Sequence, residues 1–540
     1  MATLVDEWSR LGLSDVVICP GSRSTPMTLA FWQCREISVH VRIDERSAAF
    51  FALGRSLVTS RPVALVVTSG TAAAEVHAAV AEADLANVAL VVITADRPPE
   101  LHGVGAPQTI DQQRLFGAKV RLYEEPGVAR IDAAMSWRPL ARRLYFAAAG
   151  EPGRRGPVHL NAAFVEPLLA PALELPPPAK FGASPWAGTV WRAAPIDISG
   201  QRVMCVVGGG IDDATRSQII AQAREAKWAV VGDATASDTL SYADPLLRHD
   251  AIWETLRPDV VVRIGGIPAS KFLAQRLVTS GVDMIALEGA GPVADPDGVI
   301  VRRVPGMPCA NESRHEGDER YAAQWNDTVA WLASHLARTW TEDLDEIIVA
   351  RTVVDVANET SVALVLGSSM PVRDVEWWTS TRQTSVFSNR GANGIDGVVS
   401  TFLGVAERSR AIGLVGDVTM LHDVSALVDG PGLATRAVLV VSDNVGGGIF
   451  SFLPQARQMP LESFEQLFAT PRAHDLCAVA RAFGHHAQRV STVSQLRVAV
   501  EEGLERDGLS VVVAQLPSRD DNVARHEELN ELVAEWWGER

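Results

Sequence analysis

The sequence predicts an α/β protein of three domains, each built on a parallel sheet that is flanked by helices. Its 540 residues are too many for one hydrophobic core, because domains average roughly 150 residues. Hydrophobic residues make up 47% and charged residues 21% of the chain, which excludes disordered, collagen-like and coiled-coil proteins. Short β-branched runs alternate with longer helix-like stretches. These runs are continuously apolar, as strands buried on both faces of a parallel sheet should be.

The predicted strands fall into three groups along the chain. Many of them end in Gly, Ser, Asp or Asn, where the chain turns from strand to helix. Ligands bind at the carboxyl ends of strands in such sheets, so we expect functional side chains at these endings. The predicted strands are 16–21, 37–44, 63–70, 88–96 and 156–162, then 203–209, 228–234, 260–266 and 284–289, and finally 361–368, 385–389, 410–417, 436–443 and 509–516.

Two features divide the chain into domains. The stretch 166–187 contains three consecutive prolines, Pro176 to Pro178, and is typical of an extended linker. The stretch 319–340 has an amphipathic helical pattern, and a new helix is expected to start near Glu342. We therefore predict domains at 1–175, 190–345 and 346–540.

Charge and cysteine content exclude several classes of function. The 49 basic and 65 acidic residues give a net charge of −16, which argues against a general binder of nucleic acid or anionic membranes. The five cysteines are scattered without a CxxC pair, so neither a disulfide framework nor a thiolate zinc site is expected. Asp6 and Glu7 interrupt any signal-peptide apolar region, and no apolar run is long enough for a membrane span. We expect a cytoplasmic protein.

The segment 410–453 carries the clearest pattern for ligand binding. One predicted strand ends at Asp417, and the next ends just before Asn444 and the glycines 446–448. If the two strands are adjacent and parallel, Asp417 and Asn444 lie side by side, and with a backbone carbonyl from the glycines they suit Mg²⁺. The helix after Asp417 offers its N-terminus to phosphate groups. The alternative is that Asp417 is a helix N-cap and Asn444 part of a turn, and spacing alone leaves this open.

Other candidate positions carry weaker signals. Glu45 lies where a strand ends and an apolar helix begins, and its position alone is typical of an ordinary first-turn carboxylate. Gly208 to Gly210 follow a strand but lack the GxGxxG spacing, so a tight turn is favoured over a dinucleotide loop. No GxxxxGK[ST], HExxH or GxSxG motif is present. Three histidines could touch a ligand, although capping or packing is the commoner role: His102, His422 and His474.

Several stretches together resemble one family of thiamin diphosphate enzymes, the 2-succinyl-5-enolpyruvyl-6-hydroxy-3-cyclohexene-1-carboxylate (SEPHCHC) synthases of menaquinone biosynthesis. They cover both outer thirds of the chain, and the middle third matches only loosely. The resemblance implies a pyrimidine-binding domain, a central α/β domain and a diphosphate-binding domain. The stretches are CPGSRSTP (19–26), RIDERSAAFFALG (42–54), TSGTA (68–72), TADRPPEL (94–101), SNRGANGIDG (388–397), GDVTMLHD (416–423) and GGGIFSFLP (446–454).

The resemblance implies a transferase that joins 2-oxoglutarate to isochorismate with loss of CO₂, using thiamin diphosphate and Mg²⁺ or Mn²⁺. Glu45 matches the glutamate that hydrogen-bonds the pyrimidine nitrogen of the cofactor, where a carboxyl removed from water has a raised pKa and shares a proton. Ile395 matches the residue that supports the bent cofactor. The implied metal ligands are Asp417, Asn444 and Gly446, and the other implied cofactor contacts are Ser369, Val418, Thr419, Gly447 and Ile449.

Both implied substrates are dianions, which gives arginine side chains a role. Arg390 is implied as a catalytic residue together with Glu45. Substrate contacts are further implied for Ser22, Arg23, Arg97, Gln108, Lys271, Arg373, Arg390, Phe450 and Leu453. The sequence departs from the family pattern at Glu75, Pro107, Phe272 and Arg472.

The resemblance also implies a homodimer or homotetramer whose active sites are shared between chains. Three alternatives remain at this stage. The first is another thiamin diphosphate enzyme, such as a 2-oxoacid decarboxylase or an acetolactate synthase, which would keep Glu45, Asp417 and Asn444. The others are a nicotinamide dehydrogenase built on the middle third and a non-catalytic binding protein.

Overall fold

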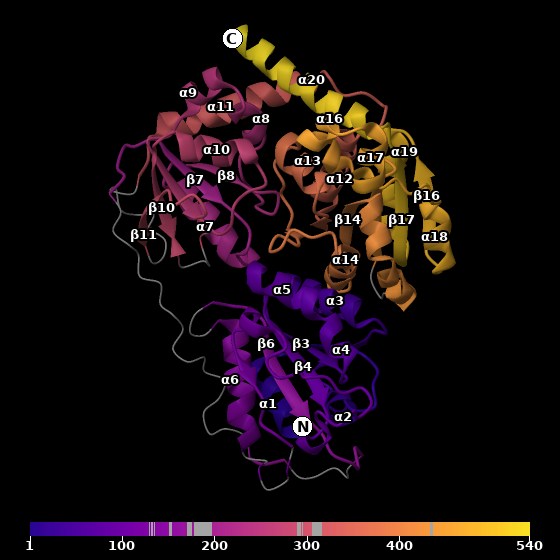
Figure 1. Cartoon of the computed structure of the whole chain (residues 1–540). Coiled ribbons are helices and arrows are strands. Elements are labelled where there is room, and N and C mark those ends of the chain that lie inside the picture. Colours follow the sequence, from indigo (N-terminus) through magenta and orange to yellow (C-terminus); the bar gives the residue numbers. More distant parts are fainter. Residues whose placement is uncertain are drawn as a thin grey trace. The chain divides into compact units, whose positions relative to one another are not determined.

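Three parallel β-sheets, one in each third of the chain, form the framework of the protein in a computed structural model (Figure 1). The chain divides into two compact units: residues 1–190 with 390–392 and 400–408 form the first, and the remaining residues form the second. The structure describes residues 1–128, 130, 133, 136–150, 154–169, 175–177, 197–288, 293, 295–304, 316–432 and 436–540. Most of the predicted linker 166–187 lies outside these residues.

The first unit contains a sheet with the order β2-β1-β3-β4-β6-β5, in which every pair is parallel. Trp8 is fully buried against it and donates its indole N–H to the carbonyl of Ala141, at 2.9 Å. The strands are β1 (Asp15–Ile18), β2 (Ser38–Val41), β3 (Val63–Val67), β4 (Leu90–Asp96), β5 (Tyr123–Glu124) and β6 (Val158–Ala163), and the helices are α1 (Ala2–Leu11), α2 (Thr25–Gln33), α3 (Glu45–Thr59), α4 (Thr71–Glu75), α5 (His77–Ala86) and α6 (Trp137–Ala149).

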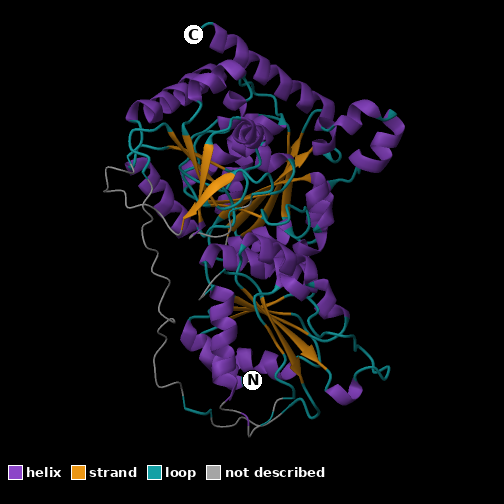
Figure 2. Cartoon of the chain, turned by 60° about the vertical axis from the view of Figure 1, so that its left-hand side comes forward, coloured by secondary structure: helices purple, strands orange, loops and turns teal. Residues whose placement is uncertain are grey.

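The second unit contains the other two sheets, and Figure 2 shows helices packed around the strands. The sheet from the middle third has the order β11-β10-β9-β7-β8 and is also parallel. Its strands are β7 (Val203–Val207), β8 (Ala229–Gly232), β9 (Val260–Ile264), β10 (Asp283–Leu287) and β11 (Ile300–Val304), and its helices are α7 (Asp213–Glu225), α8 (Ala243–Leu247), α9 (Asp250–Leu256), α10 (Lys271–Thr279) and α11 (Glu319–Leu336).

The sheet from the last third has the order β13-β12-β14-β15-β17-β16 and is parallel throughout. Its strands are β12 (Ala363–Leu366), β13 (Val386–Ser388), β14 (Ala411–Gly416), β15 (Arg436–Asp443), β16 (His486–Val490) and β17 (Gly508–Gln515). The helices are α12 (Glu346–Thr360), α13 (Met370–Trp378), α14 (Val398–Ala406), α15 (Asp417–His422), α16 (Pro454–Gln458), α17 (Leu461–Phe464), α18 (Leu476–Ala482), α19 (Val493–Glu505) and α20 (Arg519–Gly538).

The predicted fold class is confirmed, and the strands that the sequence analysis missed are all edge strands. β5, β11 and β16 each lie at one end of their sheet. Three of the five residues of β11 are exposed, and β16 also has a half-polar sequence, so neither forms the continuous apolar run of a central strand. The predicted helix at 319–340 corresponds to α11, whereas the predicted domain boundaries stay predictions.

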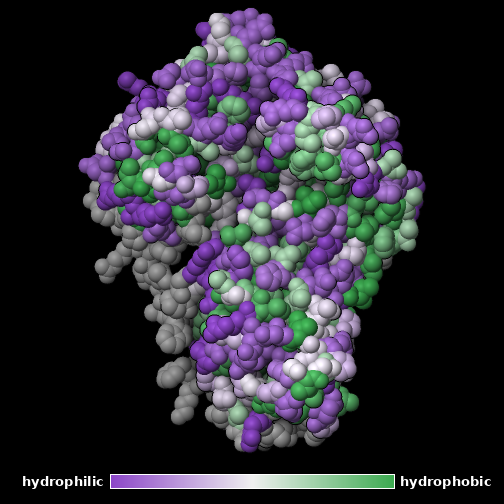
Figure 3. Space-filling model, in the orientation of Figure 1, coloured by the Kyte–Doolittle hydropathy of each residue, from purple (hydrophilic) through white to green (hydrophobic). Residues whose placement is uncertain are grey.

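The visible surface mixes hydrophilic residues with small hydrophobic groups (Figure 3). A few large apolar side chains are strongly exposed, among them Trp32 and Leu461. Single exposed apolar residues of this kind are normal on protein surfaces. Within the described residues, none of the helices combines the length and the apolar composition that a membrane crossing requires.

Candidate functional site

A pocket of about 580 Å³ opens at the carboxyl ends of β1 and β3 in the first unit. Parallel sheets bind ligands at this edge, so its position agrees with the prediction from strand endings. Helices α3 and α4 begin at its wall. The lining residues are Pro20, Gly21, Ile43, Asp44, Glu45, Thr68, Ser69, Thr71, Ala72, Glu75 and Gln108.

Glu45 is the first residue of α3 and is half-buried in this pocket. The helix starts here because Asp44 is its N-cap, and the Asp44 carboxylate accepts a hydrogen bond from the backbone N–H of Ser47 at 3.1 Å. Because Asp44 caps the helix, the Glu45 side chain is not the N-cap. Glu45 lines the pocket together with Glu75. Glu75, which departs from the family pattern, adds a carboxyl to the same pocket, which Asp44 and Glu45 also line.

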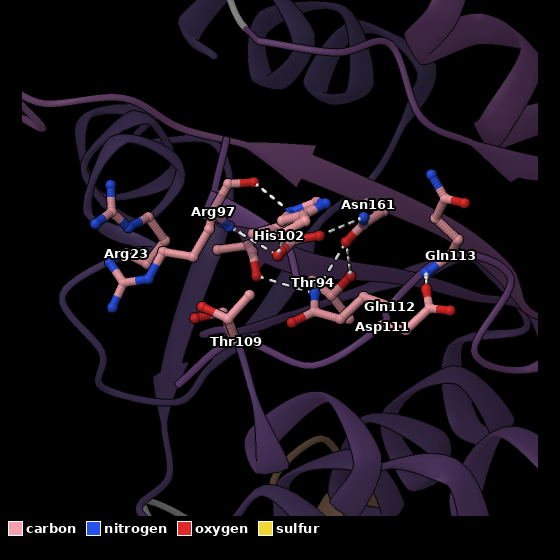
Figure 4. Close-up of polar contacts among 12 residues, drawn as sticks. Arg23, Thr94, Arg97, His102, Thr109, Asp111, Gln112, Gln113 and Asn161 are labelled. Atoms are coloured by element: carbon pink, nitrogen blue, oxygen red, sulfur yellow. Dashed lines mark hydrogen bonds and ion pairs between the residues drawn. The ribbon is translucent and has the colours of Figure 1, made fainter. Parts of the chain in front are cut away.

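Two predicted substrate arginines, Arg23 and Arg97, lie near each other in the first unit (Figure 4). Arg23 is buried, donates to the carbonyl of Phe164 at 2.9 Å and lies 3.3 Å from the Glu166 carboxylate. Burial, followed by the nearby charge of Arg97, lowers the pKa of Arg23. Two guanidinium groups that repel each other favour an anion between or beside them. Ser22 is exposed and lies between Arg23 and the pocket residue Gly21.

Arg97 is held by its own backbone and by the loop that follows β4. Its backbone N–H donates to the Asp96 carboxylate at 2.7 Å, and its guanidinium donates to the carbonyl of Pro107 at 3.1 Å. His102 contacts the Arg97 carbonyl at 2.8 Å (Figure 4), so this histidine has a structural partner. Pro107 departs from the family pattern, yet its carbonyl oxygen supports a predicted substrate arginine.

Gln108 reaches the pocket on a constrained segment of loop. Its φ of 52° lies in the left-handed region, and its carbonyl accepts a hydrogen bond from the Ser69 hydroxyl at 2.8 Å. A Cβ at Gly70 would lie 3.2 Å from the same carbonyl oxygen, so the glycine allows the close approach. The structure therefore brings Gln108 and Glu45 to the same pocket, which the predicted substrate and cofactor contacts require.

Arg390 belongs to the first unit although it comes from the last third of the chain. The carboxylate of Glu82 in α5 accepts hydrogen bonds from the backbone N–H groups of Gly391, at 2.7 Å, and Ala392, at 2.6 Å. A Cβ at Gly391 would lie 2.6 Å from the carbonyl oxygen of Glu82. Glu82 thus fixes the backbone next to Arg390, a role that the sequence analysis did not find.

In the second unit, Asp417 is the first residue after β14, and β14 pairs with β15 in parallel. This adjacency is the arrangement that the sequence analysis assumed. Asp417 is 2% exposed and accepts hydrogen bonds from Val418 N–H at 2.8 Å and Gly446 N–H at 2.7 Å. Burial and the nearby Asp443 raise the pKa of Asp417 to about 6.

Asn444 follows β15 and is oriented by a residue that the sequence analysis missed. Its side-chain NH₂ donates to the carboxyl group of Glu346 at 2.7 Å, while its Oδ1 is buried without a hydrogen-bond partner among the described residues. Glu346 is buried at the start of α12. Burial and the nearby charges of Asp374 and Asp417 raise its pKa to about 8. First-turn acids are common in helices, so no sequence signal separates Glu346 from an ordinary one.

The donor set at these two strand ends fits a hard divalent cation. Asp417 supplies a carboxylate and Asn444 an unpartnered buried amide oxygen, both of which Mg²⁺ and Mn²⁺ accept. The Gly446 carbonyl accepts from Gly448 N–H at 3.0 Å and keeps a second lone pair for a cation. In the part of the chain that the structure describes, no three His, Cys, Asp or Glu side chains form a group that could hold a metal ion, so a cation here would depend on the Asn444 amide and the Gly446 carbonyl beside Asp417.

Lys271 and Arg373 are connected in the second unit through Glu376. Lys271 is the exposed first residue of α10, and the Glu376 carboxylate accepts from the preceding N–H groups of Ala269 at 3.1 Å and Ser270 at 2.7 Å. Glu376 and Arg373 both belong to α13. One helix therefore carries one predicted substrate residue and fixes the backbone beside the other.

Phe272 stands where the family pattern has a basic residue, and the structure places a cation against it. The guanidinium of Arg248 lies 4.3 Å from the centre of the Phe272 ring and donates to Asp244 at 2.6 Å. The stacking stabilises the guanidinium through the ring quadrupole. Arg248 lies 24 positions earlier in the chain, so spacing around Lys271 could not reveal it.

The remaining predicted residues lie in the second unit. Arg373 donates to the carbonyl of Ser369, whose φ of 77° marks a strained turn before α13. Phe450 packs edge-on against Phe468 with ring centres 5.8 Å apart. Ile395 and Ile449 are half-buried, as are Val418 and Gly447, whereas Thr419 is buried and Leu453 is exposed. Arg472, another departure from the family pattern, is also exposed.

The glycines at 208–210 form a tight turn rather than a dinucleotide loop. Gly208 N–H donates to the Ile264 carbonyl at 2.8 Å, and a Cβ at Gly208 would lie 1.9 Å from the carbonyl oxygen of Gly266. The missing side chain therefore allows the ends of β7 and β9 to pack together. This geometry gives no support to a nicotinamide dehydrogenase.

Comparison with known proteins shows to which family the chain belongs. The N-terminal TPP binding domain of thiamine pyrophosphate enzymes matches residues 1–115, and the C-terminal TPP binding domain matches residues 376–514. A 2-succinyl-5-enolpyruvyl-6-hydroxy-3-cyclohexene-1-carboxylate synthase from Myxococcus xanthus is 37% identical, over 99% of this chain and 97% of its own length. The synthase of the same name from Bacillus velezensis is 34% identical, over 99% of this chain and 98% of its own.

A solved structure supports the fold. The X-ray structure of a protein from Mycobacterium smegmatis, described as a thiamin diphosphate-dependent enzyme, aligns with a TM-score of 0.68 and 18% identity, covering 95% of this chain and 99% of that one. At this identity the likeness concerns the fold alone. The full-length relatives carry the assignment further: the chain belongs to the family of SEPHCHC synthases, thiamin diphosphate-dependent transferases of menaquinone biosynthesis.

Proposed function

We propose that the protein joins 2-oxoglutarate to isochorismate with release of CO₂, giving 2-succinyl-5-enolpyruvyl-6-hydroxy-3-cyclohexene-1-carboxylate. The observation that carries this choice is the pair of arginines, Arg23 and Arg97, because both substrates are dianions. Arg23 lies two positions after the pocket residue Gly21, and Arg97 donates to the carbonyl of Pro107, which precedes the pocket residue Gln108. Another thiamin diphosphate enzyme acting on a monoanionic 2-oxo acid would need fewer cations here.

Bound thiamin diphosphate would supply the carbanion chemistry that removes CO₂ from a 2-oxo acid and transfers the remaining fragment. Glu45 would hydrogen-bond the pyrimidine ring of the cofactor and hold the shared proton at its carboxyl. Asp417, Asn444 and the Gly446 carbonyl would hold Mg²⁺ or Mn²⁺ against the diphosphate. Backbone and side chains around the diphosphate and the ring would come from Ser369, Ile395, Val418, Thr419, Gly447 and Ile449.

The substrates would be held by cations and closed in by apolar side chains. Arg390 would bind a substrate carboxylate on a backbone that Glu82 fixes. Lys271 and Arg373 would act together because Glu376 links their helices. The other substrate contacts would be Ser22, Arg23, Arg97, Gln108, Phe450 and Leu453.

We further propose that the active enzyme is a homodimer or homotetramer with shared sites. Glu45 is only half-buried in the single chain, so another protein surface would exclude water from its carboxyl. In a two-fold assembly the diphosphate-binding surface of a second copy would supply that cover.

The decisive experiment is mass spectrometry of the product formed from 2-oxoglutarate and isochorismate with thiamin diphosphate and Mg²⁺. We expect the mass of the succinyl adduct, together with one CO₂ for each product. A reaction without isochorismate should still release CO₂ slowly, since decarboxylation comes first. Pyruvate in place of 2-oxoglutarate serves as the competing substrate. Product from pyruvate but not from 2-oxoglutarate would contradict the proposal and favour an acetolactate synthase-like enzyme.

A further inference from the structure

We propose that Gln112 is a positioning residue that holds Gln108 at the pocket and thereby controls recognition of isochorismate. The inference rests on the proposed function, which assigns Gln108 to substrate binding. Gln112 lies outside the seven stretches that carried the resemblance in the sequence, and it is not among the residues that line the pocket of Glu45. It is singled out by its burial and by its hydrogen bonds.

Gln112 is 1% exposed, and both the NH₂ group and the oxygen of its side chain make hydrogen bonds (Figure 4). Its NH₂ group donates to the carbonyl of Ala95 at 3.1 Å and to Oδ1 of Asn161 at 2.9 Å. Its oxygen accepts from the backbone N–H of Gly70 at 3.0 Å. A primary amide has two donor hydrogens, and both are engaged here. One side chain therefore ties the loop to the end of β4, to β6 and to the start of α4.

The partners of Gln112 form a buried polar network. Asn161 Oδ1 also accepts from the Thr94 hydroxyl at 2.8 Å, and its NH₂ group donates to Asp96 at 2.8 Å. Asp96 in turn accepts from the backbone N–H of Arg97. Thr94, Asp96 and Asn161 are each at most 1% exposed. Buried networks of this kind are rigid when every member is satisfied, because breaking one bond leaves several groups unpaired.

Gly70 is the link between Gln112 and Gln108. Its N–H is fixed by Gln112, and its Cα faces the Gln108 carbonyl so closely that an added Cβ would lie 3.2 Å from that oxygen. Ser69, the preceding residue, donates its hydroxyl to the same carbonyl. Gln108 and Gln112 are four positions apart on one loop, so Gln112 anchors one end of the segment whose other end lines the pocket. Loss of the anchor should release Gln108 without touching Glu45.

The test compares Gln112→Met with Gln113→Met in the full-length enzyme. Methionine keeps the length of glutamine but makes none of its hydrogen bonds, and the neighbouring Gln113 is exposed, which makes it a matched control. We expect Gln112→Met to lower kcat/KM for isochorismate by about tenfold or more. A tenfold change corresponds to the free energy of about one hydrogen bond. Thiamin diphosphate affinity and CO₂ release from 2-oxoglutarate alone should stay near wild type. Gln113→Met should change none of these.

Two further measurements separate a positioning role from a general structural one. Hydrogen exchange of the segment 104–113 should accelerate in Gln112→Met and not in Gln113→Met. In the background of Gln108→Ala, Gln112→Met should add little further loss for isochorismate, because residues that act through one another are not additive. If Gln112→Met does not fold, Gln112→Asn is used, since it keeps an amide but cannot reach all three partners.

The outcomes distinguish this inference from the proposed function. Additive losses in the double variant, or unchanged exchange of 104–113, would overturn the role of Gln112. If Gln108→Ala alone leaves isochorismate kinetics unchanged, the assignment of Gln108 to the substrate fails instead. The exchange measurement still reports whether Gln112 holds the loop in that case.

Discussion

A methyl group added at Gly54 tests how closely the position of Glu45 depends on helix packing. Gly54 lies in α3 and faces the backbone of Thr401 in α14, both in the first unit. A Cβ at Gly54 would lie 2.1 Å from the carbonyl oxygen of Thr401, whereas ordinary contacts begin at 3.4 Å. A Cβ at Gly404 would lie 2.2 Å from the carbonyl oxygen of Phe51, so the two helices touch through both glycines.

Gly54→Ala should therefore push α3 and α14 apart by about 1 Å, because neither backbone can yield as a side chain would. Overpacking of this kind costs about 1–3 kcal/mol of folding free energy. Glu45 is the first residue of the displaced helix, and a misplacement of about 1 Å at a reacting group can lower the rate by up to about 100-fold. We expect a lower melting temperature and a fall in kcat that exceeds any loss of cofactor affinity.

The assay is scanning calorimetry together with single-turnover kinetics. Gly538→Ala is the matched control, because it makes the same substitution in helix α20 and its added Cβ meets no described atom within 4 Å. It should leave stability and kcat unchanged or slightly raise the melting temperature. Wild-type melting and wild-type kcat for Gly54→Ala would refute the packing argument. A lower melting temperature with unchanged kcat would show that α3 does not set the position of Glu45.

Three further predictions concern the proposed cofactor site. Glu45→Gln should abolish most turnover while folding and thiamin diphosphate binding persist, and near-normal kcat would remove Glu45 from the mechanism. The pKa of Asp417 at about 6 means that protons compete with Mg²⁺ below that pH, so Mg²⁺-dependent cofactor affinity should fall about tenfold per pH unit below 6 and stay level above it. Fluorescence titration of cofactor binding at several pH values measures this dependence. Asp417→Ala should weaken cofactor binding at least about tenfold and make it independent of pH. Cofactor affinity of the wild type that does not change with pH would contradict the assignment of Asp417 as a metal ligand. Glu45→Gln and Asp417→Ala proteins, each inactive alone, should recover about a quarter of intact sites when refolded together as dimers, and heterodimers without activity would defeat the shared-site proposal.

The sheets were predictable because their central strands are buried on both faces. A continuous run such as β15 (Arg436–Asp443) can be read directly from the sequence, since every position after the first is buried. β11 has exposed arginines in its middle, so it resembles a loop when it is viewed without its partner β10. Edge strands depend on pairing with a distant segment, and local sequence carries little of that information.

The candidate site likewise contains residues that local sequence predicts and residues that only the fold brings together. Asp417 and Asn444 could be predicted because strand endings mark where parallel sheets bind ligands. Glu346 could not, since it meets Asn444 across 98 positions and has the sequence context of any first-turn acid. Arg248 and Gln112 were missed for the same reason. Their partners, Phe272 and Gly70, are brought to them only by the fold.

The charged residues of the two units differ in a way that suits the proposed binding of anionic substrates and of a divalent cation. In the first unit, the neighbouring guanidinium groups of Arg23 and Arg97 would suit the dianionic substrates of the proposed reaction, and burial, followed by the charge of Arg97, lowers the pKa of Arg23. The second unit buries Asp417 and Glu346 together, and their raised pKa values show that ionising both is unfavourable within the protein alone. A divalent cation at Asp417 would reverse that balance and release protons as it binds, because the carboxylate must be ionised to coordinate it. Metal binding should then stabilise the second unit most at a pH at which both acids would be ionised, because their mutual repulsion is strongest there. Such a cation would offset the charge of two buried acids, Asp417 directly after β14 and Glu346 at the start of α12.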